Sequence, residues 1–154
     1  MSLEENKRAA RRIFEDLWSC ADYRVIEEII AEDCVLHVPY PAEVIPVKSV
    51  YKERVRAERE ALPDLHISVE DQIAEGDKVV TRWILRGTHT KKFLGLEPTG
   101  KKTEHMGITI FRFEAGKIKE IWLVGDELGW ISQMGLKLPA EFVRLDPREP
   151  SAGI

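Results

Sequence analysis

The chain has 154 residues, of which 44% are hydrophobic and 32% are charged, and its formal net charge at pH 7 is −4. These values predict one globular domain at residues 1–138, followed by an extended tail at residues 139–154 that carries Pro139, Pro147 and Pro150. The negative net charge argues against nucleic acid as a partner, because phosphate binding needs a clustered positive surface.

The N-terminus and the cysteines predict the compartment. The first residues are highly charged and lack the apolar segment of a signal peptide, and no apolar run approaches the ~20 residues that span a bilayer. Cys20 and Cys34 are the only cysteines, and their spacing suits no zinc site and neither demands nor excludes a disulfide. We therefore expect a cytoplasmic protein with no membrane contact.

The N-terminal part of the chain has a helical pattern. A helix is predicted at residues 4–19, and a second one runs from an N-cap at Asp22 to Ile30. A short strand at residues 34–38 and a loop at residues 39–46 lead to a third helix that ends at Ala61. The apolar stripes of the three helices are Ile13, Phe14, Leu17 and Trp18; Val25, Ile26, Ile29 and Ile30; and Val47, Val50, Tyr51, Val55 and Leu62.

After residue 63 the apolar residues alternate with polar ones, which predicts strands. We expect strands at residues 65–73 and from 78 to about 90, a hairpin at residues 103–126, and a short helix at 127–134 with Asp126 as its N-cap. Helices followed by antiparallel hairpins are typical of the α+β class. The prediction is a curved antiparallel sheet wrapped around the N-terminal helices, with a cavity at its wide end.

The hairpin at residues 103–126 is largely apolar on both faces. If its loop has three residues, Thr109 faces Ile121, and Leu123 is the diagonal neighbour of Thr109. Because a hairpin with one wet face would alternate more strictly, we expect one face to line a core or pocket and the other to meet a second layer or subunit. The first face carries His105, Gly107, Thr109, Phe111, Ile121, Leu123 and Gly125, and the second carries Met106, Ile108, Ile110, Trp122 and Val124.

Acid–base chemistry is the class of reaction that the motifs leave open. The sequence lacks a Gly-rich phosphate loop, a GxSxG elbow and an HExxH pair, so we expect no cofactor and no metal. His37, His105 and Asp126 are the candidate catalytic residues. Each has a structural alternative, namely a structural histidine for His37, a solvent-exposed one for His105 and a helix N-cap for Asp126. His66 lies on the polar side of its strand, and we expect it to be solvated.

Residues 61–136 closely resemble the SnoaL-like polyketide (ester) cyclases. The resemblance is carried, in order, by Ala-Glu-Gly-Asp, Gly-Thr-His-Thr, Phe-Leu-Gly-Leu-Glu-Pro-Thr-Gly, Gly-Lys-Ile-Lys-Glu-Ile-Trp and Gln-Met-Gly. It implies the cone-shaped α+β barrel of the nuclear transport factor two-like superfamily, with a hydrophobic pocket and a dimeric or tetrameric assembly. The best-known members close a polyketide ring by an aldol condensation without a cofactor.

The resemblance also locates the acid–base pair of those cyclases. Their catalytic Asp falls on Leu123 and its His partner on Thr109, and neither of these side chains can act as a base near neutral pH. The aldol mechanism is therefore not expected to transfer, although a pocket is. The expected ligand-binding residues are Thr109, Leu123, Ile121, Tyr40 and Trp18.

Three functions remain open from the sequence. The first is an enzyme that binds a cyclic or aromatic hydrophobic molecule and acts on it through cyclase, isomerase or hydrolase chemistry with His37, His105 and Asp126. The second is a catalytically silent binding or accessory module of the same fold, which the apolar Leu123 favours. The third is an assembly subunit, since the outer sheet face predicts a homodimer.

Overall fold

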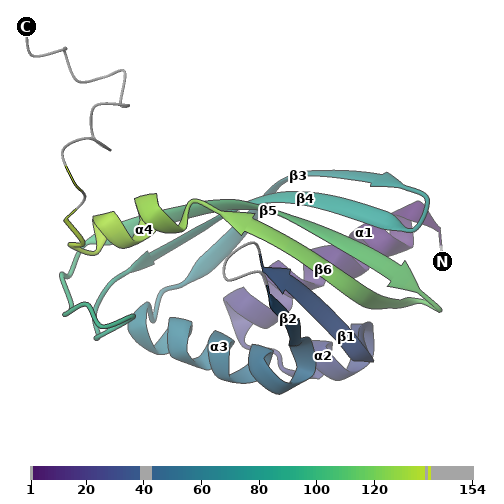
Figure 1. Ribbon diagram of the computed structural model, residues 1–154, viewed down its shortest axis with the longest axis horizontal. Coiled ribbons are helices and arrows are strands. Elements are labelled where there is room, and N and C mark those ends of the chain that lie inside the picture. Colours follow the sequence, from purple (N-terminus) through teal and green to yellow (C-terminus); the bar gives the residue numbers. More distant parts are fainter. Residues whose placement is uncertain (1, 39–42, 138, 140–154) are drawn as a thin grey trace, which may run out of the picture.

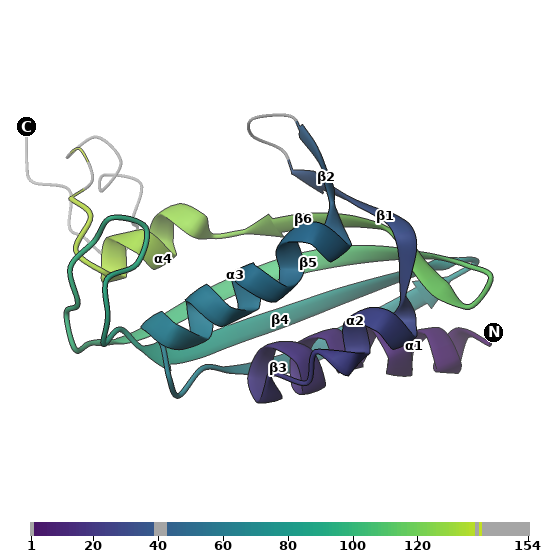
Figure 2. The same cartoon turned by 90° about the horizontal axis from the view of Figure 1, so that it is seen from below.

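The computed structural model describes residues 2–38, 43–137 and 139, and it confirms the predicted α+β class. Within these residues one sheet has the strand order β2-β1-β6-β5-β4-β3, and β1 and β6 are its parallel pair. The N-terminal helices and α3 cover one face of the curved sheet, and α4 follows its last strand (Figures 1 and 2). The strands are β1 (Ile30–Val38), β2 (Glu43–Pro46), β3 (His66–Glu75), β4 (Lys78–Thr88), β5 (Lys102–Glu114) and β6 (Lys117–Gly125).

The predicted helix at residues 4–19 is present as two consecutive helical pieces. Helix α1 (Leu3–Arg12) begins at a capping box, in which Ser2 Oγ accepts the Glu5 N–H and the Glu5 carboxylate accepts the Ser2 N–H. It continues into the π-helix η1 (Ile13–Trp18). The wider π turn directs the predicted apolar stripe at the sheet, and its four members are all buried.

The second and third helices largely follow the sequence pattern. Helix α2 (Arg24–Ile29) ends one residue earlier than expected, because Ile30 already pairs with β6. Helix α3 (Val47–Ala61) ends where predicted. Two features were not predicted: strand β1 begins at Ile30 rather than at residue 34, and the loop at residues 39–46 contains β2.

The predicted register of the β5–β6 hairpin was wrong. Its turn has two residues, Ala115 and Gly116, both with positive φ, as two-residue hairpins of type I′ require. A bulge between Arg112 and Phe113 then shifts the pairing by one further residue. Thr109 therefore pairs directly with Leu123. Because the shift totals two residues, the two faces keep the members that the sequence assigned to them.

The inner face of the sheet is the core of the protein. His105, Thr109, Phe111 and Ile121 are buried there, and Phe111 and Ile121 belong to one core cluster with apolar side chains of α1, η1 and α3. The outer face is exposed, as the fractions of 48% for Met106, 47% for Ile108 and 62% for Val124 show. These three residues, with Ile110 and Trp122, form the outer sheet patch.

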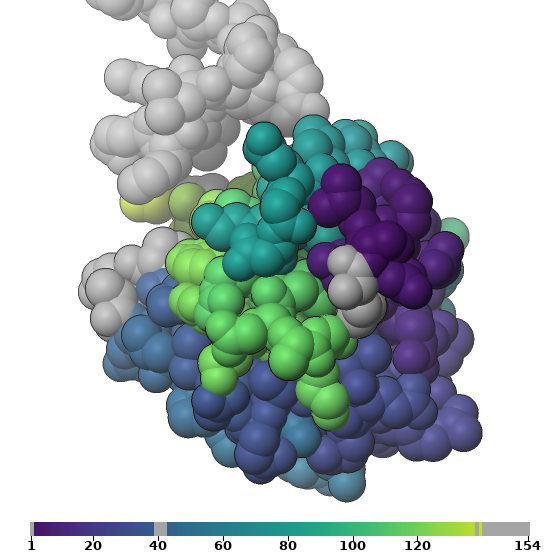
Figure 3. Space-filling view, turned by 90° about the vertical axis from the view of Figure 1, so that its right-hand side faces the viewer, coloured from purple at the N-terminus to yellow at the C-terminus, as the bar shows by residue number. Residues whose placement is uncertain are grey.

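The two hairpin turns lie at one end of the molecule. Figure 3 shows this end, where the β3–β4 turn (teal) and the β5–β6 turn (green) lie beside the N-terminal helix (purple). The short helix α4 (Glu127–Gln133) lies at the other end of the sheet (Figure 1). None of the helices found in the described residues is long and apolar enough to cross a membrane.

Candidate functional site

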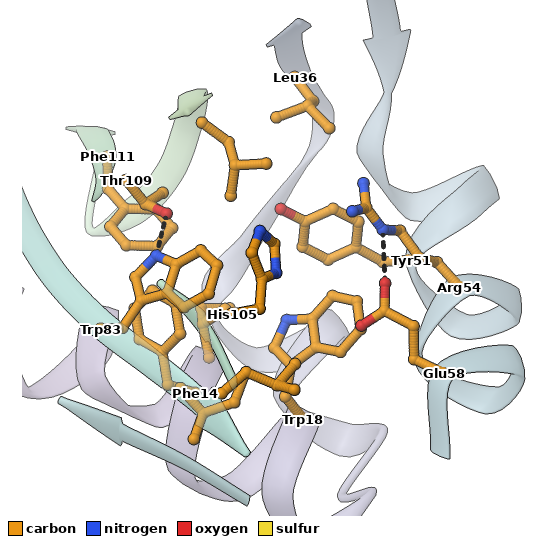
Figure 4. A pocket seen from close by; sticks show the side chains of 14 residues that line it. Phe14, Trp18, Leu36, Tyr51, Arg54, Glu58, Trp83, His105, Thr109 and Phe111 are labelled. Atoms are coloured by element: carbon orange, nitrogen blue, oxygen red, sulfur yellow. Dashed lines mark hydrogen bonds and ion pairs between the residues drawn. The ribbon is translucent and has the colours of Figure 1, made fainter. Parts of the chain in front are cut away.

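A cavity lies between the inner sheet face and the helices η1 and α3. Its volume is about 40 Å³, which is room for roughly two or three water molecules. The wall is mostly aromatic and aliphatic, with Phe14, Trp18, Trp83 and Phe111 among its rings. Five polar side chains interrupt it, and Figure 4 shows how they lie: Tyr51, Arg54, Glu58, His105 and Thr109. A drug-sized ligand needs about 300–1,000 Å³, so its entry requires wall side chains to move.

His105 is the imidazole of this cavity. Strand β5 carries it on the inner face, where its ring stacks on Trp130 of α4 with a centroid distance of 4.5 Å and an interplanar angle of 2°. The edge of the ring meets Trp83 at 5.2 Å and 84°. Thr103 holds Trp130 in place, since the indole N–H donates to Thr103 Oγ1 over 3.1 Å. The imidazole orientation is therefore set by two tryptophans.

The proton affinity of His105 is low. Its residue exposure is 3%, and among the described residues Nε2 has no hydrogen-bond partner. Burial lowers the pKa of His105 below its usual range, the Glu127 carboxylate opposes this shift, and the charge of Arg54 adds to it. The nearest Glu127 oxygen lies 3.6 Å from Nε2, too far for a hydrogen bond. The lowered pKa favours the neutral form of the imidazole, which can accept a proton.

Two paired glycines make room for these rings. Gly107 and Gly125 face each other across β5 and β6. A Cβ at Gly107 would lie 2.4 Å from Trp83 Cζ2, and a Cβ at Gly125 would lie 2.5 Å from His105 Nε2. Any side chain at either position would displace a ring from the cavity wall.

Thr109 and Leu123 lie side by side on the cavity wall. The hydroxyl oxygen of Thr109 accepts the indole N–H of Trp83 over 2.9 Å, and both groups are buried. Leu123 presents only apolar atoms. At this point the wall therefore offers a fixed hydroxyl and a methyl-bearing side chain, and neither can act as a base near neutral pH.

An ion pair on α3, which the sequence analysis did not single out, completes the polar lining. Glu58 is 5% exposed, and its Oε1 accepts the Arg54 Nε–H over 3.0 Å. Burial raises the pKa of the Glu58 carboxyl, against the opposing charge of Arg54. The sequence spacing could have indicated that Glu58 faces the core. Glu58 follows Val55 by three residues and Tyr51 by seven, which places it on the buried stripe of α3.

The π-helix positions Trp18, the predicted ligand-binding residue from the N-terminal part. The backbone carbonyls of Trp18 and Ser19 accept hydrogen bonds from Arg59 Nη1 over 3.0 and 2.6 Å. This guanidinium satisfies carbonyls that the end of η1 leaves without helical partners. The Trp18 ring is held against Tyr51 at 6.0 Å and lines the cavity.

Three other predicted site residues, His37, Asp126 and Ile121, do not line the cavity. His37 packs on Trp122 at 4.8 Å and its Nε2 lies 2.9 Å from Glu120, on the outer side of the sheet. Asp126 is the N-cap of α4, which was the structural alternative to a catalytic role. Its Oδ1 accepts the Gly129 N–H over 2.9 Å. Ile121 is fully buried on the inner face beyond the cavity wall. Tyr40 lies outside the described residues.

No cluster of three or more His, Cys, Asp or Glu side chains suited to a metal ion occurs within the described ranges 2–38 and 43–137. The side chains that line the cavity offer acid–base and hydrogen-bonding chemistry. A neutral imidazole can take up a proton, and a guanidinium and a phenol can donate hydrogen bonds to a ligand oxygen.

Several solved structures resemble the chain. AclR from Streptomyces galilaeus, a putative hydroxylase, is 26% identical, and the match covers 90% of this chain and 100% of AclR with a TM-score of 0.79. IdmH from Streptomyces antibioticus, a putative polyketide cyclase, is 25% identical, with 84% and 98% covered and a TM-score of 0.74. A putative polyketide cyclase from Acidithiobacillus ferrooxidans is 28% identical, with 87% and 97% covered and a TM-score of 0.71.

The comparison of the sequence with protein families agrees with these structures. No curated protein sequence matches the chain. The model of the family described as SnoaL-like polyketide cyclase matches residues 8–134, which includes every strand and helix that lines the cavity. With the six-stranded sheet and the N-terminal helices, this match shows that the chain belongs to the SnoaL-like polyketide cyclase family.

Proposed function

We propose that the protein is a cofactor-independent enzyme that binds a cyclic or aromatic hydrophobic molecule and moves a proton on it, with His105 as the base. The observation that carries this proposal is the buried imidazole of His105, whose Nε2 has no hydrogen-bond partner among the described residues and which lines a largely apolar cavity. A ring system would pack between the aromatic walls once side chains move apart. Thr109 and Leu123 would shape the part of the wall beside the reacting carbon.

The chemistry follows from the properties of the imidazole. His105 takes a proton from a carbon next to a carbonyl group, and the electron pair of that C–H bond moves onto the carbonyl oxygen as an enolate. The enolate then attacks a second carbonyl, as in a cyclase, or regains the proton at another carbon, as in an isomerase. His105 returns its proton in either case. The surrounding rings exclude water from the reacting atoms.

Deuterium exchange tests the proposal without knowledge of the natural substrate. The wild-type protein is incubated with 2-tetralone, an enolisable ketone with a fused aromatic ring, in deuterated buffer, and the loss of its α-protons is followed by proton NMR. We expect exchange above the buffer rate, and a decrease of about 10²–10⁴-fold in His105→Gln. His66→Gln, with an exposed histidine on β3, is the matched control and keeps the wild-type rate.

The same assay separates the other candidates. His37→Gln and Asp126→Asn alter groups outside the cavity, and we expect both to retain exchange. If either variant loses exchange while His105→Gln stays active, the base is the residue altered in that variant and not His105. Equal rates for His105→Gln and wild type would end the proposal for His105.

A second function is favoured by the pair Thr109 and Leu123. The Thr109 hydroxyl accepts a hydrogen bond from Trp83, and Leu123 has no titratable atom. If these are the positions of the acid–base pair in the cyclases, as the sequence resemblance implies, no acid–base group is present there. In this alternative the cavity only binds its ligand, as a carrier or accessory module. Ligand binding without exchange of any enolisable ketone in a panel would favour it, and turnover that pocket variants abolish would exclude it.

We further propose a homodimer through the outer sheet patch. Met106, Ile108 and Val124 are each about half exposed or more, which is unusual for neighbouring large apolar residues on a monomer. A second copy of the patch would cover them. Sedimentation should find a dimer for wild type and a monomer for Ile108→Lys, and a monomeric wild type would refute this assembly.

A further inference from the structure

Helix α3 presents an ion pair to the cavity, in which Glu58 is buried and Arg54 is partly exposed. Arg54 and Glu58 stand one helical turn apart on the face that also carries Tyr51. They lie across the cavity from Trp83 and Thr109, with His105 between the two sides (Figure 4). The Arg54 guanidinium carbon is 6.0 Å from the centre of the Trp18 ring, so the cation also faces an aromatic wall.

Stability does not account for this pair. Removing the Glu58 charge from water costs on the order of several kcal/mol, and apolar replacements of buried pairs are often neutral or stabilising. The Glu58 side chain is only 7% exposed and that of Arg54 is 39% exposed. An apolar pair at the two positions would complete the buried stripe of α3 without this cost, which indicates that the charges serve a ligand.

The guanidinium has unused donors. Nε donates to Glu58, whereas neither Nη atom has an acceptor among the residues that the structure describes. Two Nη groups in a plane match the two oxygens of a carboxylate. Glu58 fixes the guanidinium through Nε and leaves that edge available at the cavity wall.

We propose that Arg54, held in place by Glu58, is the subsite for a carboxylate on the ligand, so that the cavity takes cyclic or aromatic carboxylic acids. The inference rests on the proposed function, since the ring of the acid occupies the same cavity. Arg54 makes the bidentate contact, and Glu58 is a positioning residue whose own negative charge limits the affinity for the incoming anion.

Matched acids and amides test the subsite. Binding of benzoate, 2-naphthoate and 2-anthroate is measured by calorimetry beside that of the three corresponding amides, which lack the charge. Wild type should prefer the acids. Arg54→Gln should weaken acid binding by roughly ten- to hundredfold and leave amide binding within about twofold. Glu58→Gln should strengthen acid binding severalfold, because it removes a competing charge and keeps an acceptor for Arg54 Nε.

Two controls separate ligand binding from folding. Arg56→Gln alters an exposed arginine on the same helix and should change nothing. The double variant Arg54→Leu with Glu58→Leu should fold at least as stably as wild type and bind amides, but lose its preference for acids.

Two results would overturn the inference in different ways. If the amides bind as well as the acids, or if Arg54→Gln keeps the preference, the subsite is wrong and the ligand cavity stands. If none of the six compounds binds to wild type, the proposed ligand cavity is wrong, and the subsite is wrong with it.

Discussion

The substitution Gly107→Ala tests whether the ring packing that orients the site is as tight as the structure requires. The added Cβ would lie 2.4 Å from Trp83 Cζ2, 2.8 Å from its Cη2 and 2.9 Å from the backbone oxygen of Val124. Carbon atoms pack at about 3.5–4.0 Å, so the indole must retreat by roughly 1 Å. Its N–H then leaves the 2.9 Å hydrogen bond to Thr109.

The cost can be assembled from these two effects. Overpacking of a core costs about 1–3 kcal/mol, and an unsatisfied buried N–H costs about 1–3 kcal/mol. Ala is better tolerated than Gly within a strand by about 0.5–1 kcal/mol, which offsets part of the loss. We expect Gly107→Ala to lower the free energy of unfolding by about 1–5 kcal/mol, measured by urea denaturation with tryptophan fluorescence.

A second background isolates the cause. In Trp83→Phe the outer indole atoms and the N–H are absent, so Gly107→Ala should cost less there by about 1–3 kcal/mol, and the 2.9 Å approach to the Val124 oxygen accounts for the remaining cost. A cost below about 0.5 kcal/mol in the wild-type background would refute the predicted clash. An equal cost in both backgrounds would show that Trp83 is not its source.

Three further predictions concern the same cavity. Thr109→Val leaves the Trp83 N–H without its acceptor and should destabilise the protein by about 1–3 kcal/mol, an effect that must vanish in the Trp83→Phe background. Because the pKa of His105 is lowered in the folded state, the unfolded chain binds more protons than the folded one below about pH 6.5. As the pH falls below that value, wild type should lose stability relative to His105→Phe by up to about 1.4 kcal/mol per pH unit. Parallel stability curves for the two proteins would contradict a buried neutral imidazole. Leu123→Asp places a carboxyl on the cavity wall, and its pKa, read by NMR, should rise above the usual value of about 3.9; an unshifted value would show that the position faces water.

The period of two in the β5–β6 hairpin was sufficient to predict which residues share the cavity face. His105, Thr109 and Leu123 all lie on the inner side, as that alternation required. The pairing between strands was not predictable in the same way. It depends on a two-residue turn and a bulge near Arg112, and neither leaves a mark in the apolar pattern.

The polar half of the site shows the limits of pattern reading more clearly. Arg54 and Glu58 resemble the solvated charges of any helix surface, and only their register with Tyr51 indicates that they face inward. For His37 the alternation of the buried Cys34 and Leu36 is the local signal that turns its side chain to the other face. The pairing of β1 with β6, which is remote in the sequence, was not predictable from that local signal.

The pH profile of α-proton exchange tests the central claim most directly, since it reports on His105 in the free protein as a base. The second-order rate constant for exchange of 2-tetralone should rise with pH through one inflection below about 6.5, the usual pKa of histidine, and then level off. In His105→Gln the inflection should be absent. An inflection at or above 6.5 in wild type, or the same profile in both proteins, would contradict the assignment of a buried, neutral His105 as the catalytic base.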